Sequence, residues 1–213
     1  MADRTWDFED LEGEMATLGG RALTNRIITG EIPADADPLG GKNKLIIASG
    51  PMAGCGVSSG GRLSVGCKSP LTGGVKEANA GGIAADALAG QGIRGIILEE
   101  KAPKGSLSVL LVEDSGVRFV DGEPYRGMGN FALAEALFEE YGKNHAIISV
   151  GPAGELGMLG SGVAATDMFS RQSRMAARGG IGAVMGEVKG VKAILIPRKG
   201  PVKLPGQDSE AFK

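Results

Sequence analysis

Residues 171–186 combine three arginines with several glycines, a composition suited to binding an anion. Arg171, Arg174 and Arg178 are spaced i, i+3 and i+7, so they would share one face of a helix predicted over residues 162–177. The segment itself contains no acidic residue. Guanidinium groups suit phosphate oxygens, and glycines let backbone N–H groups approach a ligand closely. The pattern indicates a specific anionic ligand; the alternative is a solvated arginine face that runs into a tight turn.

A second candidate anion site lies in residues 60–82. Arg62 and Lys68 bracket a predicted strand, and Asn79 is predicted to open a helix that ends near Ala89. The first turn of that helix would hold only small residues, namely Ala80, Gly81 and Gly82. A helix N-terminus with unobstructed N–H donors attracts anions. The alternative is that the asparagine serves only as a helix cap.

Few residues could perform acid–base or nucleophilic chemistry. His145 is the single histidine and has no evident partner for a catalytic triad. Asp167 is expected to form a salt bridge with Arg171 or Arg174. Near-matches to a P-loop ("GRLSVGCKS") and to a dinucleotide fingerprint ("GGIGAVMG") fail on spacing and context. The sequence therefore offers a place to hold an anion, and any reaction must come from the ligand or a partner.

Composition narrows the class of protein. The protein has 213 residues, of which 42% are hydrophobic and 23% charged, and its net charge is −2. The charge and an aromatic content of 4% argue against nucleic-acid binding. No leader-like or membrane-spanning apolar run is present. The two cysteines, Cys55 and Cys67, lack metal-site spacing and are expected to be free thiols in a reducing cytoplasm.

The secondary-structure elements predicted to position these residues are strands and helices in irregular order. Strands are predicted over residues 44–49, 62–67, 93–99, 107–112, 117–120, 146–150 and 191–196. Helices are predicted over residues 10–29 (interrupted at Gly19-Gly20), 79–89, 130–142 (capped by Asn130) and 162–177. Because strands outnumber helices and do not alternate with them regularly, we expect an α+β fold with two mixed sheets. Glycine, at 37 residues, predicts many tight turns.

Four segments, in this order, resemble the N-terminal domain of aldehyde ferredoxin oxidoreductases: "DPLGGKNKLIIASGPMAG", "GGRLSVGCKSPLTGGVKEANAGG", "SVGPAGE" and "RMAARGGIGAVMG". The resemblance extends from about Leu18 to Ile196. It implies a two-sheet base that cradles a bis-pterin cofactor of tungsten, or sometimes molybdenum. In that family the iron–sulfur cysteines and the residues around the substrate lie in later helical domains.

The resemblance also assigns residues. It implies that Arg62 contacts a pterin phosphate, as do the two arginines of the last segment, Arg174 and Arg178. It also implies that residues near these arginines in the two motifs contact the cofactor, namely Asn79, Ala80, Gly81, Met175 and Ala176. It further implies that the backbone carbonyls of Asn79 and Met175 hold a Mg²⁺ ion that bridges the pterin phosphates.

Some departures from the family pattern bear on function. Ala177 stands where a glycine is expected, and the usual first strand is replaced by "MADRTWDFEDLEGEM". No four-cysteine cluster set is present, so no iron–sulfur cluster is expected in this polypeptide. We expect an extension over residues 1–17, a pterin-binding domain over 18–197 and a tail or linker over 198–213.

The implied function is that of a stand-alone N-terminal subunit, or a fragment, of a tungstopterin aldehyde oxidoreductase, with the active site completed by a second polypeptide that carries the helical iron–sulfur domains. Ferredoxin would take part indirectly, and a homo- or hetero-oligomer is expected, with an exposed face lined by Gly, Ala and Met. The alternative is a non-catalytic module that binds or delivers the cofactor, or a dimeric scaffold without cofactor.

Overall fold

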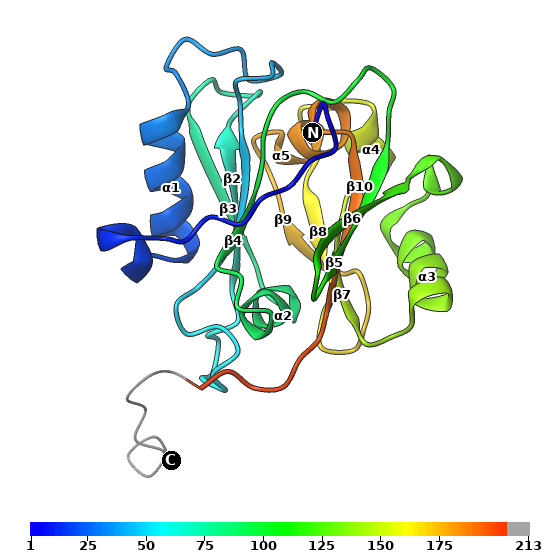
Figure 1. Cartoon of the computed structure of the whole chain (residues 1–213). Coiled ribbons are helices and arrows are strands. Elements are labelled where there is room, and N and C mark those ends of the chain that lie inside the picture. The colour runs from blue at the N-terminus through cyan, green and yellow to red at the C-terminus, as the bar shows by residue number, and fades with distance from the viewer. Residues whose placement is uncertain (204–213) are drawn as a thin grey trace.

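A computed structural model of the protein describes residues 1–203, and these residues build two β-sheets with helices packed outside and between them (Figure 1). The smaller sheet has the order β3-β2-β1-β4, from β1 (Leu45–Ser49), β2 (Leu63–Lys68), β3 (Val75–Ala80) and β4 (Gly95–Leu98). The larger sheet has the order β6-β5-β10-β7-β8-β9. Its strands are β5 (Ser108–Glu113), β6 (Gly116–Asp121), β7 (His145–Ser149), β8 (Val163–Ala165), β9 (Arg174–Ala176) and β10 (Val191–Pro197).

The predicted α+β fold with two sheets is confirmed. All seven predicted strands form, each within a few residues of its expected ends. The larger sheet is mixed, because β5 and β10 run parallel while its other pairs are antiparallel. The smaller sheet is antiparallel throughout.

Helices pack on the outer faces of the sheets and also in the core between them. They are α1 (Gly20–Glu31), α2 (Ala84–Gly90), α3 (Asn130–Tyr141), α4 (Pro152–Glu155) and α5 (Ile181–Ala183), with short 3₁₀ or π turns η1 (Gly13–Thr17), η2 (Glu123–Tyr125) and η3 (Val184–Val188). Helix α1 packs on the smaller sheet and α3 on the larger one (Figure 1). Strands such as β1, which is buried along its whole length, are apolar on both faces because a helix covers one face and the other sheet covers the second.

The predicted break in the N-terminal helix is confirmed. Gly20 has a φ of +52°, and a methyl group added at Gly19 would lie 2.8 Å from the carbonyl oxygen of Ser49. The turn η1 therefore ends before α1 begins. In α3 the N-cap is Gly129 rather than Asn130, whose side-chain oxygen instead accepts a hydrogen bond from Ser149 at 2.9 Å.

Two helix predictions are wrong. The helix expected from Asn79 begins only at Ala84, because residues 75–80 pair with β2 as an edge strand and Gly82 has a φ of +111°. The expected anion site at a helix N-terminus there does not exist. The helix expected over 162–177 is replaced by β8, a loop and β9, since β8 completes its hydrogen bonds with β7. The arginines are thus not on one helical face.

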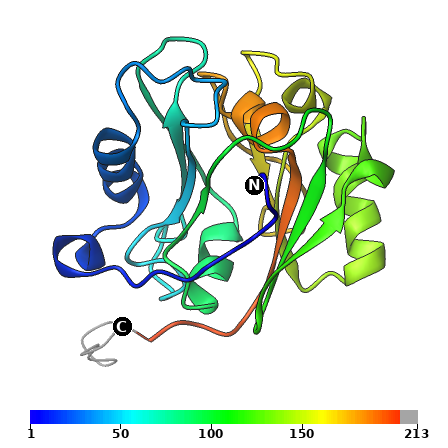
Figure 2. The same ribbon diagram turned by 45° about the horizontal axis from the view of Figure 1, so that its top comes forward.

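Both ends of the described region pass from one sheet to the other, as Figure 2 shows. The Met1 ammonium donates to the carbonyl of Glu99 at 2.9 Å beside the smaller sheet, while the ring of Trp6 packs on Gly116 in the larger. At the other end, the amide of Val202 donates to the carbonyl of Gly54 at 2.9 Å. Residues 198–203 therefore pack on the domain; the rest of the expected tail lies outside the described residues. No helix within residues 1–203 has the length and apolar character that crossing a bilayer requires.

Candidate functional site

The site residues come from two edge strands that pack against each other, β3 of the smaller sheet and β9 of the larger. Arg62 directly precedes β2, and Asn79 and Ala80 end β3. Arg174, Met175 and Ala176 constitute β9, and Arg178 follows in the next turn. The two sequence segments that carry the anion-binding pattern are therefore brought together at one junction.

Two glycines make the contact between the edges possible. A methyl group added at Gly81 would lie 3.3 Å from Nη1 of Arg62. A methyl group at Gly82 would lie 2.2 Å from the carbonyl oxygen of Thr166 and 3.4 Å from Cγ of Arg174. Residues with a side chain would force the strands apart at this point. Arg62 therefore lies beside Gly81, and Arg174 lies beside the adjacent Gly82.

The guanidinium groups at this junction differ from those of the four arginines of the domain that bind carboxylates. Arg62, Arg174 and Arg178 form no ion pair or side-chain hydrogen bond with any residue in the described range. By contrast, four arginines elsewhere bind carboxylates: Arg21, Arg118, Arg126 and Arg171. Arg62, Arg174 and Arg178 are all exposed. Three positive charges are thus available to an anionic ligand.

The backbone of β3 turns alternate residues toward β2 and away from it. At the hairpin the amide of Ser69 donates to the carbonyl of Gly74 at 2.8 Å, which makes this pair a hydrogen-bonded one. Such pairs alternate with non-hydrogen-bonded ones, and the register continues unbroken to Asn79. Asn79 therefore turns its backbone carbonyl away from β2, to the free edge. The carbonyl of Glu77, at an equivalent position, accepts a hydrogen bond from Nζ of Lys76 at 2.7 Å.

The same reasoning applies to β9. The amide of Thr166 donates to the carbonyl of Ile147 in β7 at 3.1 Å. Ala165, one residue earlier, turns its backbone groups the other way, toward its partner Arg174 in β9. Met175 is the next residue of β9 and therefore turns its backbone carbonyl away from β8. The carbonyls at the two positions assigned to a metal thus project from neighbouring free edges.

The loop that leads into β9 is held by one buried carboxylate. The Asp167 side chain is 1% exposed and accepts hydrogen bonds from the amides of Phe169 and Arg171, from Nε of Arg171 and from the Ser173 hydroxyl, all at 2.8–2.9 Å. Burial alone would raise its pKa, but the hydrogen bonds outweigh this and hold the pKa of the Asp167 carboxyl well below its usual range. The expected salt bridge is confirmed with Arg171, and Arg174 remains unpaired within the described residues.

The turn after β9 is built from three consecutive left-handed residues, Arg178, Gly179 and Gly180, with φ values of +69°, +69° and +77°. Methyl groups at the two glycines would lie 2.5 Å from Cδ of Lys76 and 2.8 Å from Cγ of Pro70. The Ser69 hydroxyl also donates to the carbonyl of Gly179 at 2.8 Å. The β2–β3 hairpin therefore fixes the turn that carries Arg178.

The alanines at the junction contribute backbone only. Ala80 and Ala176 are buried in the core between the sheets, so their methyl groups do not face solvent. A methyl group at Gly162 would lie 3.2 Å from Cβ of Ala177, which places that side chain beside Gly162. Sequence reasoning missed Thr166 and the role of Gly82 in the contact between the sheets. The adjacent glycines at 81 and 82 were the available signal.

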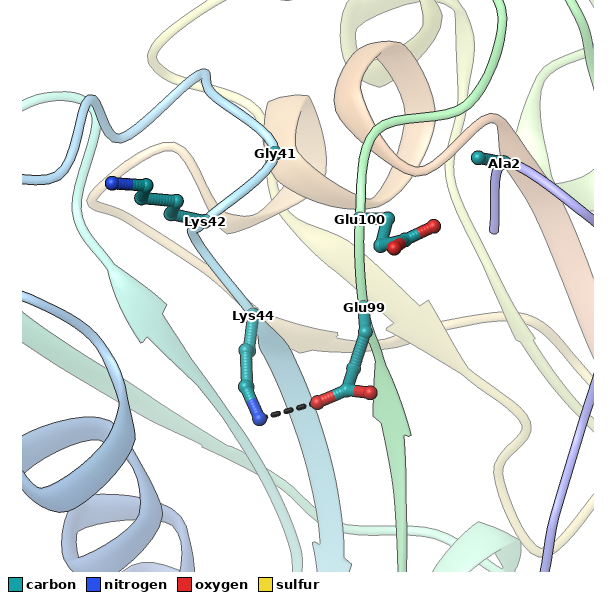
Figure 3. A pocket seen from close by; sticks show the side chains of 6 residues that line it. All are labelled: Ala2, Gly41, Lys42, Lys44, Glu99 and Glu100. Atoms are coloured by element: carbon teal, nitrogen blue, oxygen red, sulfur yellow. Dashed lines mark ion pairs between the residues drawn. The ribbon is translucent and has the colours of Figure 1, made fainter.

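Other features of the domain do not suggest a second site. Residues 1–203 contain no group of three or more His, Cys, Asp or Glu side chains able to hold a metal. Cys55 and Cys67 are buried free thiols, and burial raises the pKa of Cys67 to about 12. A surface hollow at Gly41, Lys44 and Glu99 lies outside the junction (Figure 3), and its charges pair with each other, as Lys44 does with Glu99.

The structure defines an α+β domain of two sheets whose edge strands meet at a basic, glycine-lined junction. Residues 1–198 match the family described as aldehyde ferredoxin oxidoreductase, N-terminal domain, and the protein belongs to this family. The resemblance seen in the sequence is thereby confirmed.

Several known proteins are similar to this one. The tungsten-containing aldehyde ferredoxin oxidoreductase of Pyrococcus furiosus is 35% identical over 207 residues, which are 96% of this chain and 33% of that protein. The Pyrococcus abyssi enzyme of the same name is 37% identical over 199 residues, 92% of this chain and 32% of the enzyme. The chain thus spans about a third of the length of these curated relatives.

A solved structure supports the fold. The active site complex BamBC of benzoyl coenzyme A reductase, in complex with 1,5-dienoyl-CoA, superposes with a TM-score of 0.80 and 28% identity, over 88% of this chain and 28% of that one. An aliphatic sulfonate oxidoreductase, WOR-like subunit, of Pyrococcus furiosus is 31% identical over 200 residues, 86% of this chain and 30% of that subunit. Members of this group thus include subunits of larger assemblies.

Proposed function

We propose that this protein binds a metallopterin, with tungsten or molybdenum held by two pterins, as part of an aldehyde:ferredoxin oxidoreductase. The observation that carries the proposal is the set of three guanidinium groups without an acidic partner in the described residues, at a junction lined by Gly81 and Gly82. The names of the relatives favour tungsten. Phosphate is the part of such a cofactor that guanidinium groups recognise.

The residues present fit this cofactor. Arg62, Arg174 and Arg178 would neutralise the pterin phosphates, while the backbone of Ala80, Gly81 and Ala176 would let the pterins lie close to it. The carbonyls of Asn79 and Met175 would bind Mg²⁺. Mg²⁺ prefers oxygen ligands in an octahedron, so two carbonyls leave positions for phosphate oxygens and water.

A partner polypeptide is part of this proposal, and it is supported by the apolar side chains exposed on this domain. Exposed apolar side chains surround the junction, and their exposure is typical of a surface that another protein covers. They are Leu71, Val75, Leu156, Met158, Leu159 and Met175. Pro70 and the carbonyl of Leu159 both adjoin Gly180, so the hairpin and the 156–160 loop belong to one surface. The partner would bring the iron–sulfur domains and so complete a hetero-oligomer.

The bound metallopterin would supply the redox chemistry that converts an aldehyde and water to a carboxylic acid, with electrons passing through the partner to ferredoxin. This protein's own residues would bind and orient the cofactor and exclude water from one side of it. A cytoplasmic location belongs to the proposal, since Cys55 and Cys67 would stay reduced there. The second candidate is a non-catalytic module that binds or delivers the cofactor. It is favoured because, within residues 1–203, no side chain at the junction is placed to act as an acid, base or nucleophile.

The test is anaerobic purification of the protein with and without the polypeptide that carries the helical domains, followed by metal analysis and pterin fluorescence. We expect tungsten or molybdenum with pterin in wild-type protein and its loss on Arg174→Ala. Arg118→Ala, an arginine on the far edge of the larger sheet, is the matched control and should retain the cofactor. Cofactor without aldehyde oxidation by the complex would favour the binding module. Protein free of pterin even with its partner would refute both.

A further inference from the structure

The outer face of the β2–β3 pair holds a buried carboxylate beneath α1. The Glu77 side chain is 6% exposed and accepts three hydrogen bonds. They come from Nε of Arg21 at 2.7 Å, from the Ser64 hydroxyl at 2.6 Å and from Nδ2 of Asn79 at 2.6 Å. Burial alone would raise the pKa of the Glu77 carboxyl, but these hydrogen bonds outweigh it and lower the pKa.

Close packing of α1 fixes this carboxylate. A methyl group at Gly66 in β2 would lie 3.0 Å from Cδ1 of Ile28 and 3.1 Å from Cβ of Thr24, so the helix lies directly on the strand. The Thr24 hydroxyl lies 3.3 Å from that of Ser64, which extends the network into the helix. Glu77 thus joins β3 to both β2 and α1 through side chains.

An edge strand is held by a neighbouring strand on one side only, so contacts made by its side chains matter more to its position. The amide group of Asn79 donates to Glu77 and faces α1, while its backbone carbonyl turns to the junction. We propose that Glu77 is a positioning residue: its carboxylate fixes the side chain of Asn79 and thereby holds the Asn79 carbonyl at the free edge, where it meets the cation. This inference rests on the proposed function.

The first test measures binding of Mn²⁺ together with inorganic pyrophosphate to the full-length protein, by calorimetry and by the EPR signal of Mn²⁺. We expect Glu77→Leu to weaken binding about tenfold, as the loss of one well-placed ligand would. Glu77→Gln should lose less, because its amide oxygen can still accept from Asn79. Glu113→Gln removes an exposed ion pair with Arg118 on the far edge of the larger sheet, and this control variant should bind as wild type does.

A second variant distinguishes the role of the Asn79 side chain from that of the Asn79 backbone carbonyl. Asn79→Asp places a second carboxylate beside Glu77 and removes the donor, so we expect weaker Mn²⁺–pyrophosphate binding. If the side chain itself were the metal ligand, the carboxylate would bind Mn²⁺ more tightly, and that result would overturn the inference.

A measurement without ligand distinguishes the proposed role of Glu77 from the proposed function. Amide hydrogen exchange at Ala80 and Gly81 should speed up in Glu77→Leu and remain unchanged in Glu113→Gln. Unchanged exchange together with wild-type affinity would refute the role of Glu77 while leaving the proposed function intact. Failure of the wild-type protein to bind Mn²⁺ and pyrophosphate would instead refute the proposed cation site, and this inference with it.

Discussion

The amide of Ile83 donates a hydrogen bond to the carbonyl of Thr166 at 3.0 Å, and this bond joins the two sheets at the junction. Ile83 follows the glycine pair that ends β3, and Thr166 follows β8. The bond therefore fixes the distance between the segment with Arg62 and the segment with Arg174. Residues far apart in sequence become one binding surface through this contact.

Gly82→Ala should break this junction. The added methyl group would meet the Thr166 carbonyl, and the left-handed backbone adds strain, so we expect a loss of about 3 kcal/mol in the free energy of unfolding. Urea denaturation measures it. Gly105→Ala is the control, since Gly105 also has a positive φ (+77°) but open space around it, and about 1 kcal/mol is expected there. Equal losses in the two variants would contradict the role of the contact.

Arg178→Gly should weaken ligand binding without lowering the stability of the fold. Arg178 has a left-handed backbone, which a glycine adopts without steric strain, so the variant should be equally stable or more stable, by up to about 1 kcal/mol. At the same time it should bind inorganic pyrophosphate more weakly, because one of the three guanidinium groups is lost. Calorimetric binding and thermal melts on the same preparation check both effects. Unchanged affinity would remove Arg178 from the site.

Asp167→Asn should lower stability at neutral pH through loss of the network that holds the loop before β9. The folded-state pKa of Asp167 is depressed, so its contribution is present above the unfolded pKa of about 3.9 and is lost as the pH falls. The difference in melting temperature between wild type and variant should therefore be largest above pH 5 and shrink below pH 4. A difference that stays constant across this range would show that the charge of Asp167 contributes nothing.

Lys189 should make stability rise at alkaline pH. Its buried Nζ donates to the carbonyls of Asn43 and Glu100, and burial lowers its pKa to about 8. Between that value and about 10.4 the Lys189 side chain binds more protons in the unfolded protein than in the folded one, so its own contribution to stability rises with pH over this window. Lys189→Met should remove this rise in a series of urea titrations from pH 7 to 10. A rise that persists in the variant would assign it to another group.

Elements whose pattern is local could be predicted from the amino-acid sequence alone. Alternating and continuous apolar runs with turn residues predicted seven strands, and the stripe of Leu133, Leu137 and Phe138 predicted α3, because burial of an apolar face depends mainly on periodicity. The linked motifs around Arg62 and Arg174 also sufficed to indicate the family.

The conformation of the site depends instead on contacts between distant segments of the fold. The segment around Asn79 became an edge strand because β2 offered it a partner, and residues 162–177 left the helical pattern because β7 bound β8. Hydrogen-bond partners from distant strands outweigh local helix propensity, and a single sequence does not reveal which strands will meet. For the same physical reason the outward carbonyls of Asn79 and Met175 follow from ladder register, which exists only once the sheets have formed.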